Sequence, residues 1–351
     1  MDKLLTGRRN MVSAGAPKRA TLQDVANLAG CSLSTASTIL NNSKGNSQVT
    51  DATRQRIVAA AKQLHYQPNL NARRLAMQRY DDVIGVTLDS HAPFLYRDIV
   101  TEFEKLVSAQ GMCVMIGMLH NDLERIKKYV NVFLGSGIQR VLCLTHTYPE
   151  FGKAVPALFE HFDQVVFFGK PLAPTRFPYI AADEFGNYKH AVEYLLGNGR
   201  RRIYHLRCHR LDSSFQPAFD GFLAAYAEAG LEPPEDAFFH CDPDFFTSEE
   251  DAERAISPLL ERRPDALMLH DDESVFWAMR VLRRHGFRVP EDVALFSGNL
   301  WRFAHCGTPG LAGIGFNPKR IGRLALDLFL QKTKVKEFLV PADIVPGDSC
   351  R

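Results

Sequence analysis

The stretch TLQDVANLAGCSLSTASTILNN, residues 21–42, predicts two short helices joined by a turn. Thr21 is placed to cap the first helix, and Asp24 follows three residues later, as in a capping box. Gly30 ends this helix, because glycine readily adopts the left-handed conformation that follows many helices. The apolar residues of the first helix recur at helical spacing on one side: Leu22, Val25, Ala26 and Ala29.

The second helix has two different faces. Ser32 caps it, and its apolar side holds Ala36, Ile39 and Leu40. The opposite side holds Leu33, Ser34, Ser37 and Thr38. This outer side has no acidic residue and several small hydroxyl groups, which approach phosphates closely. It is therefore suited to lie against DNA.

A third helix follows the polar loop NNSKGNSQ. Thr50 caps it, with Arg54 and Lys62 outward and four apolar residues inward: Ile57, Val58, Ala61 and Leu64. Two helices around a glycine-containing turn, braced by a third, predict a helix-turn-helix, whose second helix enters the major groove. The alternative is a plain three-helix bundle with polar outer faces, because such patterns also arise by chance.

The segment YQPNLNARRLAMQRY, residues 66–80, predicts a short hinge helix. Pro68 and Asn69 form its entry and cap, and residues 70–77 have the length of two turns. An isolated helix of this length is marginal in water. It therefore needs a surface or a partner in order to form.

Charge is divided unevenly along the chain. Residues 1–80 hold 12 Lys/Arg and 3 Asp/Glu, a charge of +9, while residues 81–351 hold 30 and 37, a charge of −7, and the sum is the overall +2. Such asymmetry points to a polyanion as the partner of the basic part. The alternative is a basic disordered tail, but only five of the 12 cations lie in residues 1–19, which we expect to be disordered.

The composition favours a cytoplasmic protein. No run of 18 apolar residues is present, and the first twenty residues lack the apolar stretch of a signal peptide, so we expect no membrane span. The seven cysteines are scattered and none forms C-x-x-C, which indicates reduced thiols rather than a disulfide framework.

From residue 82 onward, apolar strand-like runs alternate with helical stretches. Examples are VIGVTLD, MCVMIGML, QVVFFGK, RIYHLRC, ALMLHDD and VALFSG, each separated from the next by helical periodicity. Repeated β-α units with apolar strands predict parallel sheets covered by helices. Their number favours two similar lobes, divided near residue 182, with the chain crossing back near residue 310. Ligands of such folds bind outside the carboxyl ends of the strands.

Several blocks together resemble the lactose-repressor (LacI/GalR) family of bacterial transcription regulators. They are TLQDVANLAGCSLSTASTILNN, VTDATRQRIVAAAKQLHYQPNLNARRLA, VIGVTLDS, YLLGNGRRRIYHL, FDGFLAAYAEAGL, PDALMLHDDE and GFRVPEDVALFSGN. The similarity runs from Ala20 to the C-terminal region. It implies a homodimer that binds a double-stranded, pseudo-palindromic operator and represses transcription. It also implies a periplasmic-binding-protein-like core that takes a small effector, often a sugar or a metabolite.

The resemblance implies the domain organisation. We expect a basic tail over residues 1–19, an all-α helix-turn-helix domain over residues 20–65 and a hinge helix and linker over residues 66–81. Residues 82–351 are expected to form the α/β domain that binds effector and dimerises, built of two Rossmann-like parallel-sheet lobes. We expect no cofactor and no metal.

The resemblance also assigns DNA contacts. Leu33 and Ser34 open the recognition helix and are expected to meet base edges. Thr38 stands where many members have Arg, a strong guanine reader, so an inherited operator sequence is in doubt. Contacts to the DNA backbone are expected from Thr21, Thr35, Ser37, Asn41 and Arg54.

In the hinge, the resemblance implies minor-groove contacts by Asn69, Ala72, Arg73 and Leu75. The family wedges a leucine, here Leu75, into the minor groove at the operator centre and kinks the DNA there. A hinge helix that forms only on the operator is a natural switch, because any change in its spacing at the dimer interface alters its stability.

The effector lobes match the family less well. The family's frequent ligand-binding Arg corresponds to Ala218, and a ligand-binding Asp corresponds to Asn299. The further effector-contact candidates are Tyr96, Phe246, Asp271 and Trp301. Core packing is the alternative for each aromatic residue. The two lost charges leave open an uncharged or differently oriented ligand, or no small effector.

Enzyme motifs are missing from the sequence. We find no G-x-S-x-G, no G-x-G-x-x-G after a strand, no P-loop and no H-E-x-x-H. His205, Cys208 and His209 suggest a metal only superficially, since no fourth ligand accompanies them. His270, Asp271 and Asp272 suggest acid-base chemistry, but the family places a ligand-binding turn there. A transcriptional regulator is therefore expected; the alternative is a sugar-binding module or an α/β enzyme with an incidental helical leader.

Overall fold

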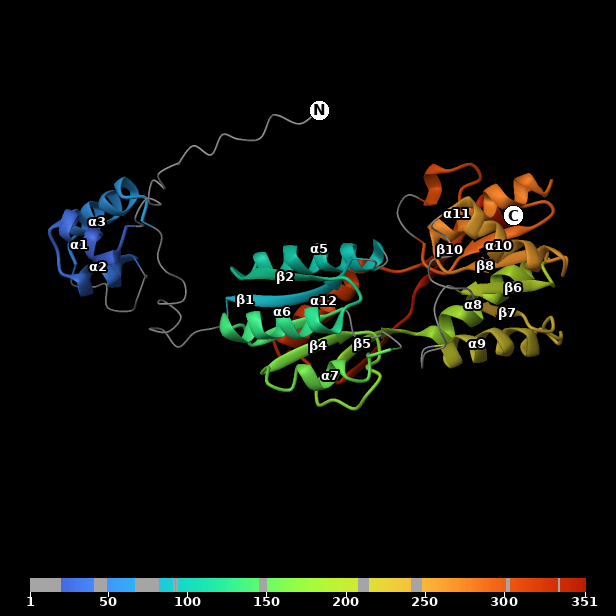
Figure 1. Cartoon of the computed structure of the whole chain (residues 1–351), viewed down its shortest axis with the longest axis horizontal. Coiled ribbons are helices and arrows are strands. Elements are labelled where there is room, and N and C mark those ends of the chain that lie inside the picture. Colours follow the sequence, from blue (N-terminus) through green and yellow to red (C-terminus); the bar gives the residue numbers. More distant parts are fainter. Residues whose placement is uncertain are drawn as a thin grey trace, which may run out of the picture. The chain divides into compact units, whose positions relative to one another are not determined.

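The structure is a computed structural model that describes residues 20–40, 49–66, 82–90, 92, 94–144, 150–207, 215–240, 248–300, 304–333 and 335–351. The chain divides into two units, Met1–Arg79 and Tyr80–Arg351 (Figure 1). The N-terminal tail expected over residues 1–19, and residues 67–81 of the expected hinge segment, lie outside the described residues.

The first unit contains three helices, α1 (Leu22–Ala29), α2 (Leu33–Leu40) and α3 (Asp51–Gln63). The capping box of α1 is present: the Asp24 N–H donates to Thr21 Oγ1 at 3.2 Å, and the Thr21 N–H donates to Asp24 Oδ2 at 2.8 Å. Gly30 follows in the left-handed conformation, with φ 63°. The Cys31 N–H then bonds back to the Ala26 carbonyl at 3.0 Å, which closes the turn into α2.

One apolar cluster joins the three helices. Its buried members are Val25, Ala26, Ala29, Ala36, Ile39, Ile57, Ala60 and Ala61. The expectation that Val58 points inward was wrong, because its side chain is 52% exposed. Each residue turns the helix by about 100°, so the buried side of α3 is centred on Ile57, Ala60 and Ala61 and leaves Val58 at its margin.

The second unit begins with a lobe built on a six-stranded sheet, in the order β11-β5-β4-β3-β1-β2. Its strands and helices are β1 (Val83–Asp89), α5 (Phe94–Ser108), β2 (Cys113–Leu119), α6 (Leu123–Gly135), β3 (Arg140–Cys143), α7 (Val155–Leu158), β4 (Gln164–Phe168), β5 (Tyr179–Ala182), α12 (Pro318–Phe329) and β11 (Glu337–Val340). All of its neighbouring strands are parallel. We call this part lobe 1.

Alternate residues of each strand in lobe 1 enter different cores. Val166 and Phe168 of β4 pack with α5 and α12, whereas Val165 and Phe167 pack with α6 and α7. Parallel strands are covered on both faces in this way, which explains their nearly continuous apolar sequences. α12 approaches α5 closely at Gly322, where an added Cβ would lie 3.0 Å from the Phe103 backbone nitrogen.

Lobe 2 repeats the plan with strand order β12-β10-β9-β8-β6-β7. Its elements are α8 (Glu184–Gly197), β6 (Ile203–Arg207), α9 (Phe215–Glu228), β7 (Phe238–His240), α10 (Glu249–Leu260), β8 (Ala266–Leu269), α11 (Asp272–Arg284), β9 (Ala294–Ser297), η3 (Ala304–Cys306), β10 (Ala312–Gly315), β12 (Asp343–Val345) and η4 (Asp348–Cys350). α10 and α11 cover one face, and α8 and α9 cover the other. Only β12 runs antiparallel among the paired strands that the structure describes here.

The chain passes between the lobes three times. It leaves lobe 1 after β5, returns after β10 to add α12 and β11, and leaves again after β11 to add β12 and η4 (Figure 1). The alternation of strand-like and helical runs in the sequence predicted only the first two passages. The last turn is anchored in lobe 2, because Ser349 Oγ donates to the Leu295 carbonyl at 2.6 Å and accepts from the Ala312 N–H at 2.9 Å.

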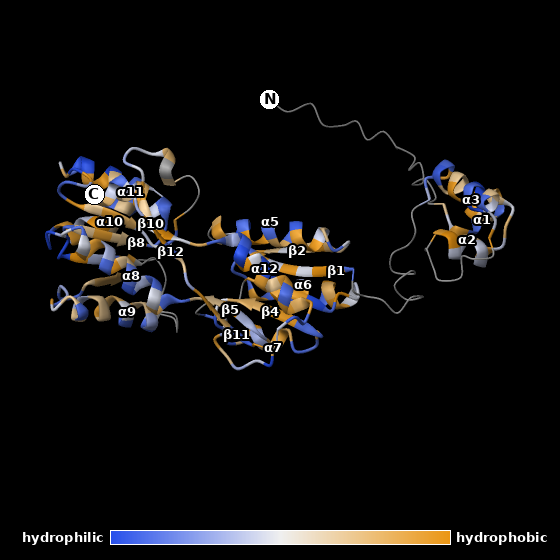
Figure 2. Cartoon of the chain, turned by 180° about the vertical axis from the view of Figure 1, so that it is seen from behind, coloured by the Kyte–Doolittle hydropathy of each residue, from blue (hydrophilic) through white to orange (hydrophobic). Residues whose placement is uncertain are grey.

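The hydropathy of the elements follows this layering. Figure 2 shows strands of both lobes mainly in the hydrophobic colour and blue residues along the outer sides of the helices. The carboxyl ends of the parallel strands share one edge of each sheet, and their amino ends share the other. Each lobe thus offers two chemically different edges, which we call the carboxyl edge and the amino edge.

Candidate functional site

The outer side of α2 is open and uncharged. Leu33 at its first position is 45% exposed, and Ser34 next to it is exposed as well. No charged residue occurs anywhere in the sequence of α2, LSTASTIL. A negative charge would repel DNA phosphates, so this composition leaves the helix free to enter a groove.

The hydroxyl groups of α2 are not equally available. Thr35 Oγ1 and Ser32 Oγ share a hydrogen bond of 2.7 Å at the start of the helix, where Ser32 also accepts from the Thr35 N–H. Thr38 Oγ1 donates to the Ser34 carbonyl at 2.9 Å. Leu33 and Ser34 are therefore the most accessible of the expected reader positions.

Two further expected contacts lie on the neighbouring helices. The Thr21 side chain is part of the capping box, since its hydroxyl also donates to Asp24 Oδ2 at 2.7 Å. Arg54 is half-buried in α3. Asn41 and the hinge residues Asn69, Ala72, Arg73 and Leu75 lie outside the described residues.

Three expected effector residues lie near the carboxyl edges of the sheets. Tyr96 packs edge-on against Phe168, the last residue of β4, with ring centroids 5.0 Å apart. Asp271 caps α11, because its Oδ1 accepts from the Ser274 N–H at 2.9 Å and from the Ser274 hydroxyl at 2.8 Å. Asn299 follows β9 and is half-buried. Phe246 and Trp301 lie outside the described residues.

The carboxyl edge of lobe 1 holds polar residues that were not among the sequence-based candidates. Ser90 Oγ and His120 Nδ1 lie 2.7 Å apart, and each follows the last residue of a neighbouring strand, β1 or β2. The buried Asp89 accepts from the Asn121 N–H at 2.7 Å beside them. Polar residues directly after two adjacent apolar strands were a usable signal for this pair.

The carboxyl edge of lobe 2 is acidic around the start of α11. Burial, and then the negative charge of Asp271, raise the pKa of Glu273. Asp272 is 8% exposed in the same turn. A ligand that approaches this turn meets carboxylates, so the turn disfavours a negatively charged ligand.

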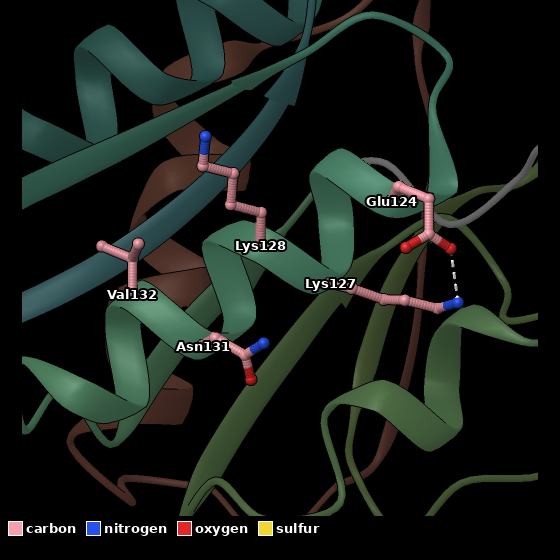
Figure 3. A pocket seen from close by; sticks show the side chains of 5 residues that line it. All are labelled: Glu124, Lys127, Lys128, Asn131 and Val132. Carbon is pink, nitrogen blue, oxygen red and sulfur yellow. Dashed lines mark hydrogen bonds and ion pairs between the residues drawn. The ribbon is translucent and has the colours of Figure 1, made fainter.

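The side chains that line a shallow hollow on α6 do not point toward one common space. It has a volume of about 430 Å³ and is lined by Glu124, Lys127, Lys128, Asn131 and Val132. Figure 3 shows Lys128 and Val132 on one side of the helix and Lys127 with Glu124 on the other. Lys127 Nζ already pairs with Glu124 Oε1 at 2.6 Å.

Of the possible metal ligands in HLRCH, the structure describes His205 alone. His205 is fully buried and its Nε2 lies 3.0 Å from the Tyr188 hydroxyl, while Cys208 and His209 lie outside the described residues. Within the described ranges, no group of three or more His, Cys, Asp or Glu is placed to hold a metal ion. In the same ranges, Cys31, Cys113, Cys306 and Cys350 are free thiols. No described helix is both long and apolar enough to cross a bilayer.

Two family models match the chain in the order of its units. Residues 21–69 match the family described as bacterial regulatory proteins, lacI family, and residues 192–350 match the periplasmic binding protein-like domain. The chain belongs to the LacI family. The members of this family are transcriptional regulators.

Curated relatives of the LacI family match over nearly the whole length. The HTH-type transcriptional repressor PurR of Mannheimia succiniciproducens is 25% identical over 91% of this chain and 93% of its own length. PurR of Escherichia coli is 28% identical over 89% of this chain and 90% of its own length.

Solved LacI-family structures share the fold. The lac repressor dimer bound to operator and an anti-inducer aligns with a TM-score of 0.79 at 23% identity, covering 95% of this chain and 99% of that one. The regulator CelR in complex with cellobiose aligns with a TM-score of 0.66 at 24% identity, covering 94% of this chain and 100% of that one.

Within the LacI family, this chain departs from the resemblance at its effector residues. Ala218, which stands in place of the family Arg, is fully buried in α9 against the core of lobe 2. An arginine at this position would place its charge in an apolar core. The side chains around Ala218 are therefore packed for a small apolar residue and not for a ligand-binding arginine. The expected Asp is the neutral Asn299.

Proposed function

We propose that this chain is a homodimeric transcriptional repressor that reads a palindromic operator with α2 and the hinge, under the control of a small-molecule effector. The observation that carries this function is the open, uncharged outer side of α2, directly after the closed Gly30 turn. Leu33 and Ser34 are the proposed base readers. Thr21, Thr35, Ser37, Asn41 and Arg54 are the proposed backbone contacts, and Thr38 occupies the position of the missing guanine reader.

The proposed dimer forms along β2, the outermost strand of the lobe 1 sheet, and not at its carboxyl or amino edge. β2 is an edge strand of that sheet, and its sequence CVMIGML carries no charge. Its exposed apolar side chains are Met115, Ile116 and Met118, and Val132 of α6 is exposed as well. Natural edge strands are usually charged or covered, because an apolar edge pairs with any other strand. A second copy related by a twofold axis covers both edges at once.

The effector is proposed to bind at the carboxyl edges, where Tyr96, Phe246, Asp271, Asn299 and Trp301 are the candidate contacts. Ala218 and Asn299 offer no charge, and the turn at Asp271 and Glu273 is acidic. Both observations favour an uncharged ligand over an anion, and a neutral sugar or sugar derivative is the first class to test. The solved CelR complex contains cellobiose, a neutral sugar.

Genomic selection tests the operator proposal. Purified full-length protein is mixed with genomic fragments at physiological salt, and the retained fragments are sequenced. We expect a shared palindrome with a flexible central step, which also identifies the controlled genes. If no fragment is enriched over random DNA with or without candidate sugars, the repressor function is wrong.

The alternative function is a sugar-binding module or an α/β enzyme whose helical leader is incidental. The two functions differ in what residues 1–80 contribute. Deleting these residues removes DNA affinity from a repressor. It changes nothing in a protein that never binds DNA and only binds or converts a small molecule. A DNA-directed regulator also places the chain in the bacterial cytoplasm, which we propose as its location.

Arg54→Ala tests the proposed phosphate contact on α3. We expect affinity to fall similarly on operator and on random DNA, because a phosphate contact carries no sequence information. The slope of log affinity against log salt should decrease by about 1. Fluorescence anisotropy over a salt series measures both quantities. A loss confined to one sequence would instead make Arg54 a base reader.

Leu75→Ala tests the proposed wedge in the hinge. The wedge acts only where the central step opens, so we expect specific affinity to fall by about tenfold and non-specific affinity to change little. Operator and random duplexes of equal length are compared at one salt concentration. Equal losses on both duplexes would contradict a wedge at the operator centre.

A further inference from the structure

The third passage of the chain between the lobes is hydrogen bonded to both of the others. Before this passage, β11 pairs with β5, and the pairing ends with Val340 opposite Ala182. After it, β12 pairs with β10, and the pairing begins with Asp343 opposite Gly315. β5 leads into the first passage and β10 leads into the second. The third passage therefore connects the other two.

Asn187 of α8 binds the short stretch between these two pairings. The Ala342 N–H donates to Asn187 Oδ1 at 2.9 Å, and Pro341 before it has no N–H that needs a partner. The Asp183 N–H, which directly follows β5, donates to the Val340 carbonyl at 3.1 Å. The first and third passages are thus joined by one backbone bond and one side-chain bond.

The amide of Asn187 is fixed in direction but only partly satisfied. Asn187 is 2% exposed, and its oxygen must face the third passage because it accepts the Ala342 N–H. Its Nδ2 makes no hydrogen bond with any residue that the structure describes. A buried donor without a partner is unfavourable. This orientation of the lobes therefore carries a penalty, which an orientation that gives Nδ2 an acceptor would remove.

Phe316 of the second passage packs against both lobes. It is half-buried and contacts the core of lobe 1 at α5 and α12 and the core of lobe 2 at α8 and α9. Among the described residues, it alone packs with apolar cores of both lobes. A change in the orientation of the lobes has to move this ring out of one core. Close-packed cores favour a few discrete arrangements over a continuous range.

We propose that Asn187 and Phe316 form a latch that fixes the orientation of the two lobes, so that all three passages move together and the lobes reorient in one step. Asn187 joins the first and third passages, and Phe316 holds the second against both cores. The unpaired Nδ2 keeps this latch releasable. An effector at the carboxyl edges acts on the latch by binding better to one of the two orientations, and this last step alone rests on the proposed function.

Hydrogen–deuterium exchange of the full-length protein, measured by mass spectrometry, tests the latch without any ligand. Asn187→Ala and Phe316→Ala should each speed exchange about tenfold in all three passages, because the loss of one contact frees the others. The peptides to compare cover residues 182–188, 313–317 and 340–345. Asn187→Ala has to act on the second passage, although its side chain is bonded to the third.

Asn198→Ala and Phe287→Ala are the matched controls. Asn198 lies at the far end of α8, where its Nδ2 donates to the Tyr194 carbonyl at 2.7 Å. Phe287 is half-buried like Phe316, but it packs against a core of lobe 2 alone. Both controls should leave exchange in the three passages unchanged. Circular dichroism checks that each variant keeps the fold.

The latch is overturned if exchange rises only beside the substituted residue, if it rises equally over a whole lobe, if it does not rise, or if the controls act as strongly. Should an alanine variant fail to fold, Phe316→Leu replaces it, because leucine keeps a smaller apolar contact. It must still speed exchange in all three passages, by a smaller factor. The assay contains no DNA, so none of these outcomes bears on the repressor function.

Discussion

Leu33→Glu should lower operator affinity by about 100-fold or more, because it places a negative charge on the side of α2 that faces the DNA. Leu33 is 45% exposed, so the substitution removes little buried surface. A glutamate at the first position of a helix also interacts favourably with the helix dipole. The loss of affinity should therefore occur without loss of folding.

Fluorescence anisotropy with the selected operator at fixed salt measures the effect, and thermal unfolding checks the fold. Gln63→Glu is the control, since it places the same charge on the exposed end of α3, on the side away from Arg54. We expect the control to lose much less affinity than Leu33→Glu. If Leu33→Glu binds as tightly as the unaltered chain, then α2 is not the recognition helix.

Ile116→Lys should separate the homodimer into monomers. Ile116 lies in the middle of the exposed β2 edge and is 45% exposed in the single chain. Across a twofold axis, the added ammonium of one subunit lies close to the same ammonium of the other subunit. The two like charges repel, they lose much of their hydration, and the apolar contact between the two isoleucines is lost. A monomer binds one half-site, so operator affinity should fall by about 100-fold.

Sedimentation velocity measures the oligomeric state, and anisotropy with full and half operators measures the lost bivalency. Val335→Lys is the matched control, because Val335 is 51% exposed and lies beside β11, at the far edge of the same sheet. The control should remain dimeric. A dimeric Ile116→Lys variant, or a monomeric Val335→Lys variant, would place the interface elsewhere.

The first unit could be predicted from the sequence because its signals are local. Thr21, Asp24 and Gly30 act within one helix and its turn, and all three occupy the expected places. The error at Val58 is one of helical phase, since three alanines follow it directly and give little hydrophobic contrast. Periodicity locates the buried side of such a helix only approximately.

The last fifty residues were harder to predict because their pairing is distant in sequence. β11 pairs with β5, so Glu337 lies opposite Tyr179 and Val340 opposite Ala182. Nothing in EFLV, a four-residue run with alternate side chains exposed, specifies this distant neighbour. The alternation of strands and helices predicted both lobes, but it did not predict the third passage between them.

The effector contacts stay predictions, because the fold alone does not show which residues touch a ligand. Asp271 was expected as a ligand contact, and its carboxylate is engaged in capping α11. Ser90 and His120 were not among the candidates, although each directly follows a strand that was expected. A binding site depends on which strand ends meet in space, and a single sequence contains that information only through the long-range contacts of the fold.

The three passages between the lobes have a consequence for synthesis on the ribosome. The helix-turn-helix unit is complete once residue 66 has emerged, whereas lobe 1 still lacks α12 and β11 until residue 340 has been made. Domains fold from the N-terminus during translation, so the DNA reader exists long before the unit that controls it. A nascent or prematurely terminated chain presents a β5 edge without its β11 partner, and is therefore a natural substrate for chaperones and proteases.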